Sequence, residues 1–132
     1  MRASLGLSPS VARRNSEDQE QIAYFKWLQL QHPNIFDMAI HVPNGGKRSK
    51  AEGAIFKAMG VKKGFPDIAV FMPTEDFSGL MIEMKSAKGS PTPDQIDWGE
   101  RLGERGYRWV ICYGWQEAAQ ATSDYFGLPT RI

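Results

Sequence analysis

Two carboxylates and a lysine in the middle of the chain are the residues best suited to chemistry. Asp67 follows Pro66, and fifteen residues separate it from the triplet Glu83-Met84-Lys85. Side chains alternate along a strand, so Glu83 and Lys85 share one face when this stretch is extended. If the segments around Asp67 and Glu83 pair as a hairpin, both carboxylates and the Lys85 ammonium meet at one end of a sheet.

Such a group favours a divalent cation. Two neighbouring carboxylates repel each other, and partial burial makes the repulsion more costly. Mg²⁺ or Mn²⁺ would relieve it, because these ions take carboxylate oxygens and also accept a substrate phosphate. The combination predicts phosphodiester hydrolysis by a metal-activated water, with Lys85 and the cation stabilising the charge of the transition state.

Structural explanations stay open for the same residues. Asp67, taken alone, is typical of a residue at a turn or a strand start. Lys85 could form a purely structural ion pair with either carboxylate. Glu83 lies between Ile82 and Met84 in an apolar stretch, where a charge is rarely placed without a partner.

The elements that would position these residues follow from periodicity and turn residues. Ser16 and Gln19 form a capping-box pattern that predicts a helix over 17–31, and residues 1–15 are expected to form a flexible tail. We predict strands over 36–42, 66–72, 79–85 and 108–113, helices over 49–59, 93–105 and 115–124, and a hairpin over 66–85. The order predicts one α/β domain over 16–132, with a small mixed sheet flanked by helices.

The composition is that of one domain. The chain has 132 residues, of which 42% are apolar and 23% charged, and this excludes wholesale disorder and a coiled coil. No apolar run is long enough to span a bilayer, and no secretory signal is evident, so we expect a cytoplasmic protein. Cys112 is the one cysteine, which excludes a disulfide within the chain and a cysteine-built zinc site. We expect Cys112, Trp27, Trp98 and Trp109 to be core residues and His32 to lie on the surface.

Basic residues cluster before Asp67. Between residues 47 and 63 six cations face the single acid Glu52, so the local charge is six minus one, or +5, in a chain with a net charge of only +1. The cluster predicts contact with a DNA backbone, a solvated helix face being the alternative. Its members are Lys47, Arg48, Lys50, Lys57, Lys62 and Lys63.

A turn precedes this cluster and could add phosphate contacts. Asn44, Gly45 and Gly46 follow Pro43, and glycine-rich turns can present backbone N–H groups to a phosphate. His41 lies just before the turn on an expected strand. It is either a histidine at the strand edge or a residue close to substrate phosphate.

Taken together, these segments resemble the VRR-NUC subfamily, the virus-type replication-repair nucleases of the PD-(D/E)xK nuclease superfamily. The similarity runs through Ser16, Glu17, Glu20 and Gln21, then HVPNGGKR (41–48), Gly64-x-Pro66-Asp67, GLMIEMK (79–85) and SPTPDQ (90–95). The resemblance implies a compact PD-(D/E)xK nuclease-like domain. It also implies a Mg²⁺- or Mn²⁺-dependent DNA endonuclease acting in repair and recombination on branched DNA such as Holliday junctions, in a bacterial or phage-infected cell.

The resemblance also implies roles for single residues. Asp67 and Glu83 match the family's metal-binding carboxylates, and the backbone carbonyl of Met84 would be a further ligand. Lys85 matches the catalytic lysine. Gln95 matches a glutamine on the following helix, where it would orient the lysine or contact phosphate.

One assignment on the first helix leaves a choice. The family's first-helix glutamate, a further metal ligand, matches Glu17 best, because Glu17 shares a helix face with Phe25 and Leu28. Glu20 is the alternative.

The expected partner is a second copy of the chain, and three rival functions stand beside the proposed one. Symmetric substrates need two sites, which together with the resemblance predicts a homodimer. A sequence-specific restriction-type endonuclease is disfavoured because the short chain has little room for a recognition domain. A non-catalytic DNA-binding module of the same fold and a structural protein remain as rival functions.

Overall fold

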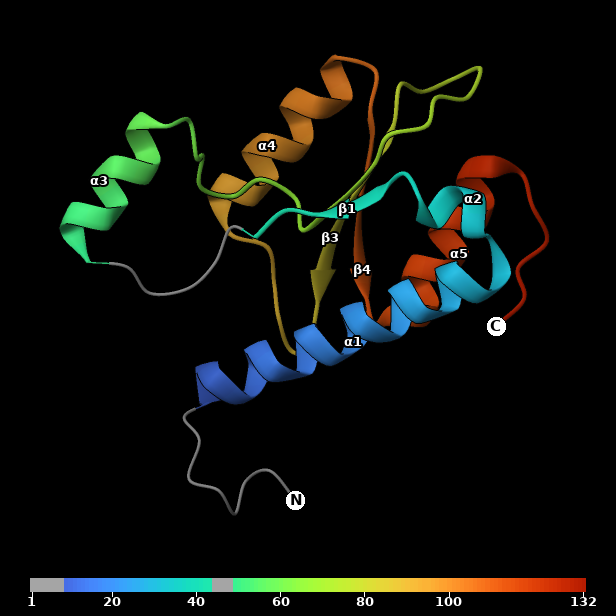
Figure 1. Ribbon diagram of the computed structural model, residues 1–132, viewed down its shortest axis with the longest axis horizontal. Coiled ribbons are helices and arrows are strands. Elements are labelled where there is room, and N and C mark those ends of the chain that lie inside the picture. The colour runs from blue at the N-terminus through green and yellow to red at the C-terminus, as the bar shows by residue number, and fades with distance from the viewer. Residues whose placement is uncertain (1–8, 44–48) are drawn as a thin grey trace.

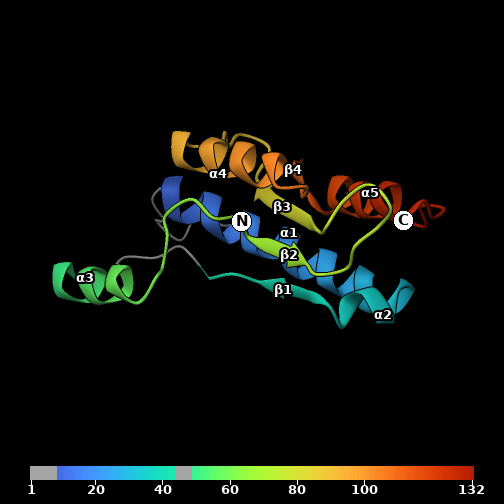
Figure 2. The same ribbon diagram turned by 90° about the horizontal axis from the view of Figure 1, so that it is seen from above.

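The chain forms an α/β domain with a four-stranded mixed sheet between helices (Figures 1 and 2). A computed structural model describes residues 9–43 and 49–132. The elements are α1 (Pro9–Gln31), α2 (Pro33–Phe36), β1 (Ala39–His41), α3 (Lys50–Ala58), β2 (Ile68–Val70), β3 (Leu80–Lys85), α4 (Pro93–Glu104), β4 (Arg108–Tyr113) and α5 (Trp115–Phe126).

The strands lie in the order β1-β2-β3-β4. β1, β2 and β3 pair antiparallel, whereas β3 and β4 pair in parallel. The predicted hairpin is confirmed, with Ile68 opposite Ile82. All six residues of β3 are buried, because helices cover both faces of the sheet at this strand. The expected fold class, a small mixed sheet flanked by helices, is therefore confirmed.

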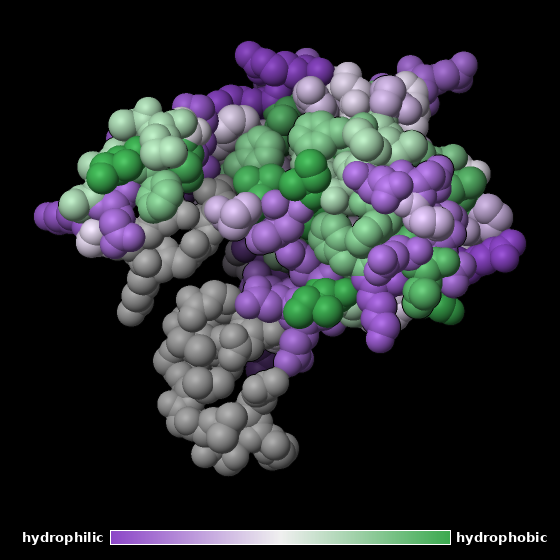
Figure 3. Space-filling model, in the orientation of Figure 1, coloured by the Kyte–Doolittle hydropathy of each residue, from purple (hydrophilic) through white to green (hydrophobic). Residues whose placement is uncertain are grey.

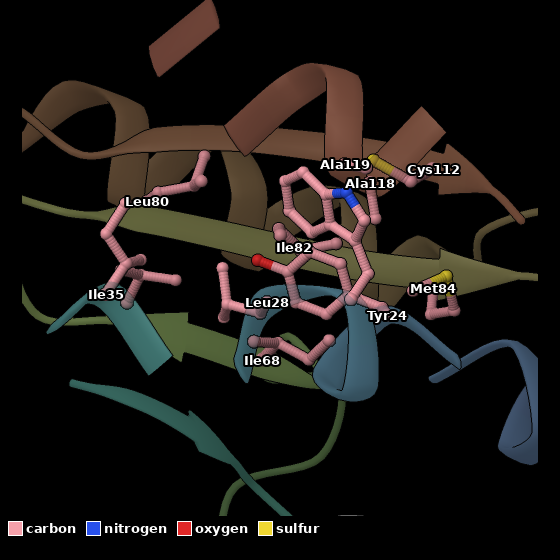
Figure 4. Packing of buried hydrophobic residues seen from close by; sticks show 12 residues of the cluster. Tyr24, Leu28, Ile35, Ile68, Leu80, Ile82, Met84, Cys112, Ala118 and Ala119 are labelled. Atoms are coloured by element: carbon pink, nitrogen blue, oxygen red, sulfur yellow. The ribbon is translucent and has the colours of Figure 1, made fainter. Parts of the chain in front are cut away.

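Two apolar clusters hold the helices on opposite faces. The larger one joins the sheet to α1 and α5 (Figure 4) and contains Tyr24, Leu28, Ile68, Ile82, Met84, Cys112, Ala118 and Ala119. The smaller one lies under α4 and contains Ala69, Met81 and Leu102, with Phe65, Trp98, Tyr107 and Trp109 packed against it. Alternate residues of β3 serve the two clusters, as the strand period requires.

The expected core residues lie in these clusters. Cys112 and Trp27 are buried, and Trp98 and Trp109 pack against the cluster under α4. The expectation for His32 is wrong. His32 is half-buried and its ring lies edge-on to that of Trp27, with ring centroids 5.4 Å apart.

Two element boundaries differ from the expectation. α1 begins at Pro9, not at residue 17, so Ser16 lies inside the helix and does not cap it. Proline fits the first turn of a helix, and extending an existing helix costs less than starting one. Residues 1–8 of the expected tail lie outside the described part of the chain. The short helix α2, which begins at Pro33, delays β1 to Ala39.

Candidate active site

Asp67 and Glu83 meet because of the β2–β3 register. In this register Ile68 lies opposite Ile82 and Ala69 lies opposite Met81. Continued by one residue, the register places Asp67 opposite Glu83, with both side chains on the face of the sheet that α4 covers. The backbone N–H of Met84 donates to Oδ2 of Asp67 at 2.8 Å. The convergence predicted from the sequence is present.

Glu83 is a buried carboxylate with an incomplete set of partners. Its exposed fraction is 1%. Oε2 accepts a hydrogen bond from Nε2 of Gln95 at 3.2 Å and lies 3.9 Å from Nζ of Lys85. Within the described residues Oε1 has no hydrogen-bond partner. Burial and the adjacent Asp67 carboxyl raise the pKa of Glu83 to about 9, because both oppose a second negative charge here.

Gln95 is held by the first turn of α4. Its Oε1 accepts from the backbone N–H of Thr92, and Oγ1 of Thr92 accepts from the backbone N–H of Gln95. This capping box leaves Nε2 of Gln95 to donate to Glu83. The structure thus joins Gln95 to the carboxylate that lies beside Lys85, and the expected roles of Gln95, orienting the lysine or contacting phosphate, stay predictions.

The two candidate glutamates of α1 have different surroundings. Glu17 lines the pocket that contains Asp67 and Glu83, and its charge contributes to the raised pKa of Glu83. Oε1 of Glu20 accepts from the backbone N–H of Trp115 at 3.0 Å, at the start of α5. Gly114 at that N-cap has no side chain to do so. The geometry thus places Glu17 at the site and Glu20 in a helix cap.

The pocket has a volume of about 510 Å³. Its wall combines α1, β3, the start of α4 and the segments before β2, through Glu17, Asp18, Gln21, His41, Pro43, Lys63, Gly64, Phe65, Asp67, Glu83, Met84, Lys85, Thr92 and Gln95. Nδ1 of His41 lies 2.9 Å from the backbone carbonyl oxygen of Asp67, which places the ring at the mouth of the site.

The predicted DNA-contact residues are only partly gathered here. Lys63 lines the pocket and lies 3.8 Å from Oδ2 of Asp94. Lys50, Lys57 and Lys62 are exposed on or after α3 and do not line it. The predicted contacts at Asn44, Gly45, Gly46, Lys47 and Arg48 lie outside the described residues.

The structure adds residues that sequence reasoning did not assign to the site. Gln21 follows Glu17 by one helical turn, and that spacing could have identified it. Thr92 could have been identified from the Thr-x-x-Gln capping pattern. Gly64 has a φ of +89°, and a Cβ there would lie 2.7 Å from the backbone of Asp94, so glycine is required where the chain passes the start of α4.

The donor atoms fit a hard divalent cation. The described residues contain no group of three or more His, Cys, Asp or Glu side chains that could bind a metal alone. Asp67 and Glu83 supply two carboxylates. In an extended strand the carbonyl of Met84 lies on the same edge as its N–H, which points to Asp67. Oε1 of Glu83 has no hydrogen-bond partner among the described residues, and its carboxyl has a raised pKa, so a divalent cation would satisfy both the free oxygen and the negative charge.

Comparison with known proteins agrees with this architecture. The model of the VRR-NUC domain family matches residues 15–116, and the chain belongs to that family. A solved structure named "VRR_NUC domain protein" is 30% identical, with a TM-score of 0.75 over 86% of this chain and 90% of that one. No curated protein matches the chain significantly. The fold is therefore of the nuclease type.

Among the described residues, no helix has the length and apolar character needed to cross a membrane.

Proposed function

We propose that this protein is a metal-dependent DNA nuclease that hydrolyses phosphodiester bonds. The observation that carries the proposal is the pairing of half-buried Asp67 with buried Glu83, which has one unpartnered carboxylate oxygen among the described residues, in a domain of the VRR-NUC family. Asp67, Glu83 and the Met84 carbonyl would hold Mg²⁺ or Mn²⁺, and Glu17 would bind it directly or through water. When bound, the cation supplies Lewis-acid polarisation of the phosphate and a lower pKa for the attacking water.

The other side chains have distinct tasks in this proposal. Lys85 is 8% exposed and lies beside Glu83. Its ammonium would orient the attacking water and stabilise charge on the phosphate in the transition state. Gln95 would keep the Glu83 carboxylate in place through Nε2. His41 and Lys63, at the mouth of the pocket, would contact the DNA backbone.

Branched DNA, such as a Holliday junction, is the proposed substrate, and a homodimer is the proposed active form. The basic residues of the 47–63 segment can contact phosphates of any sequence. Two symmetric strands require two active sites, and a pair of chains would provide them.

The test is cleavage of labelled plasmid, linear duplex and four-way junction with Mg²⁺, Mn²⁺ or EDTA. We expect metal-dependent cleavage, greatest on the junction, and its loss in Asp67→Ala and Lys85→Ala. The control is Lys26→Ala, which removes an exposed lysine of α1. Cleavage that survives both site substitutions contradicts the proposal.

The same assay separates the rivals. Cleavage of linear duplex at one fixed sequence would indicate a restriction-type enzyme. Salt-sensitive DNA binding without cleavage in any metal would indicate a non-catalytic binding module.

A further inference from the structure

Helix α3 has an apolar face that nothing in the described part of the chain covers. Ala51, Ile55, Ala58 and Met59 recur at helical spacing and share this face. Ile55 is 60% exposed and Met59 is 73% exposed, and no residue of α3 is buried. Figures 1 and 2 both show α3 standing apart from the sheet and from the other helices.

Local signals define α3 well. Ser49 and Glu52 form a complete capping box, Lys57 lies in the last turn, and Gly60 follows with a φ of +101°. A helix of nine residues is nevertheless marginal in water. An apolar face on so short a helix indicates that a second surface stabilises it.

A second exposed apolar surface lies on the sheet. We call it the sheet surface, and it consists of Met38, Ile40 and Phe71, each roughly half-exposed. The backbone N–H of Phe71 donates to the carbonyl of Met38 at 3.0 Å, so these residues are adjacent. Ile40 pairs with Ala69, which belongs to the cluster under α4. α4 packs on β4, at the other end of the sheet, and so leaves the β1 end bare.

Both apolar surfaces are presented on one side of the molecule. Figure 3 shows hydrophobic residues on α3 and over the region of β1 in the same view. The chain does not bring them together. Gly64 passes within contact distance of the Asp94 backbone, and Lys63 lies beside the Asp94 carboxylate. These contacts place the segment that follows α3 beside the start of α4.

The charges of the two regions are complementary. Residues 49–63 contain Lys50, Lys57, Lys62 and Lys63 against Glu52. Residues 33–42 and 64–79, which contain the sheet surface, have four acids and neither lysine nor arginine. Attraction therefore favours contact between α3 and a sheet surface, whereas pairing the 49–63 segments of two chains would bring eight lysines together.

We propose that α3 of each chain packs its Ile55–Met59 face on the sheet surface of a second copy. A two-fold axis makes the exchange reciprocal, so each chain gives one helix and receives one. Both apolar surfaces are then covered, and the two-fold axis repeats the contact. The inference rests on the proposed homodimeric state and is independent of the nuclease chemistry.

The first test is the mass in solution, measured by light scattering at tens of micromolar protein in EDTA. Wild type is expected to be a dimer. Met59→Glu and Phe71→Glu are each expected to be monomers with unchanged circular dichroism. Leu30→Glu on α1 is the matched control, because Leu30 is also 73% exposed but lies outside both surfaces, and it should remain dimeric. A monomeric wild type, or a dimer that survives both surface substitutions, overturns the proposal.

The second test identifies the contact. Met59→Cys protein is mixed with differently tagged Phe71→Cys protein and treated with a short bis-maleimide, the native Cys112 being buried. A cross-link between the two chains is expected, and Met59→Cys with Leu30→Cys should give none. A double variant that cross-links only within one chain would show that α3 folds onto its own sheet, and this overturns the proposal. Asp67→Ala should remain dimeric, which separates a failed interface from a failed nuclease assignment.

Discussion

Two polar pairs, each with at least one buried member, have opposite character in this domain. Tyr24 and Thr122 lie in the core between α1 and α5, and the Tyr24 hydroxyl bonds Oγ1 of Thr122 at 2.8 Å. Thr122 in turn donates to the carbonyl of Ala118, also at 2.8 Å. Asp67, which directly precedes β2, and Glu83 in β3 instead place two acids together and leave an oxygen of Glu83 unpartnered among the described residues. Burial raises the pKa of both Tyr24 and Glu83. Of the two, only Glu83 has a buried oxygen without a hydrogen-bond partner among the described residues.

Burial alone does not distinguish a structural pair from a functional one. A buried tyrosine stays neutral at ordinary pH and needs one partner, so the pair with Thr122 stabilises the fold. A buried carboxylate beside another acid destabilises the fold unless a cation or a proton compensates. A pair that is costly for the metal-free fold and faces a pocket is typical of a functional site.

Glu83→Gln is expected to have the largest effect on both cleavage and stability. We expect cleavage to fall about 10²–10³-fold, because the proposed cation loses one of its two carboxylate ligands. In EDTA at pH 7 the same variant should be more stable than wild type, by on the order of 1–3 kcal/mol, since wild-type Glu83, with a pKa of about 9, takes up a proton on folding and an amide does not. Gel assays and urea unfolding measure the two effects.

The matched change in the other pair is Thr122→Val. It leaves the Tyr24 hydroxyl without its partner and should lower the free energy of unfolding by about 1–3 kcal/mol, with cleavage unchanged below the melting temperature. If both variants shifted stability in the same direction, the contrast between the pairs would be wrong.

Addition of Mg²⁺ or Mn²⁺ tests whether a cation stabilises the acidic pair. The cation binds the folded site and not the unfolded chain, so wild type should be stabilised by about 2.7 kcal/mol at a concentration 100 times the dissociation constant. Differential scanning fluorimetry should show a rise in melting temperature for wild type and little or none for Asp67→Asn. An equal rise in both proteins would place the cation elsewhere.

Substitutions of Glu17 and Glu20 on α1 should have smaller effects, and the two substitutions should change different properties. Glu20→Gln removes the charged cap of α5 and should cost about 1 kcal/mol of stability, with the metal dependence of cleavage unchanged. Glu17→Gln should raise the Mg²⁺ concentration needed for half-maximal cleavage, because it removes a charge that lines the pocket. The reverse pattern would exchange their roles.

Thr92→Val is the mildest change. Loss of the cap should cost about 1 kcal/mol. Because the capping box also sets the amide of Gln95, cleavage should fall less than tenfold and be restored by Thr92→Ser. Rescue of stability without rescue of cleavage would show that the cap does not position Gln95.

Much of this architecture could be predicted from local patterns. The spacing of Asp67 and Glu83, and the alternation of Glu83 with Lys85, determine which side chains meet once the hairpin forms, and the hairpin is present. The extension of α1 to Pro9 could not be predicted, because Ser16 and Gln19 form a capping pattern that the longer helix does not use. Both residues are acceptable inside a helix, so local propensity did not decide the boundary.

The sequence alone identifies the pair of acids, the lysine and the basic segment as candidate site residues, and it predicts the order of the elements other than α2. These features could be recognised because residue type, strand period and turn chemistry are local properties. The tertiary structure decided three further points. Glu20 caps α5 while Glu17 lines the pocket, Gln95 binds Glu83 and not Lys85, and the faces of α3 and β1 remain bare. Each depends on which segments, distant in sequence, lie against one another, and long-range packing sets that arrangement.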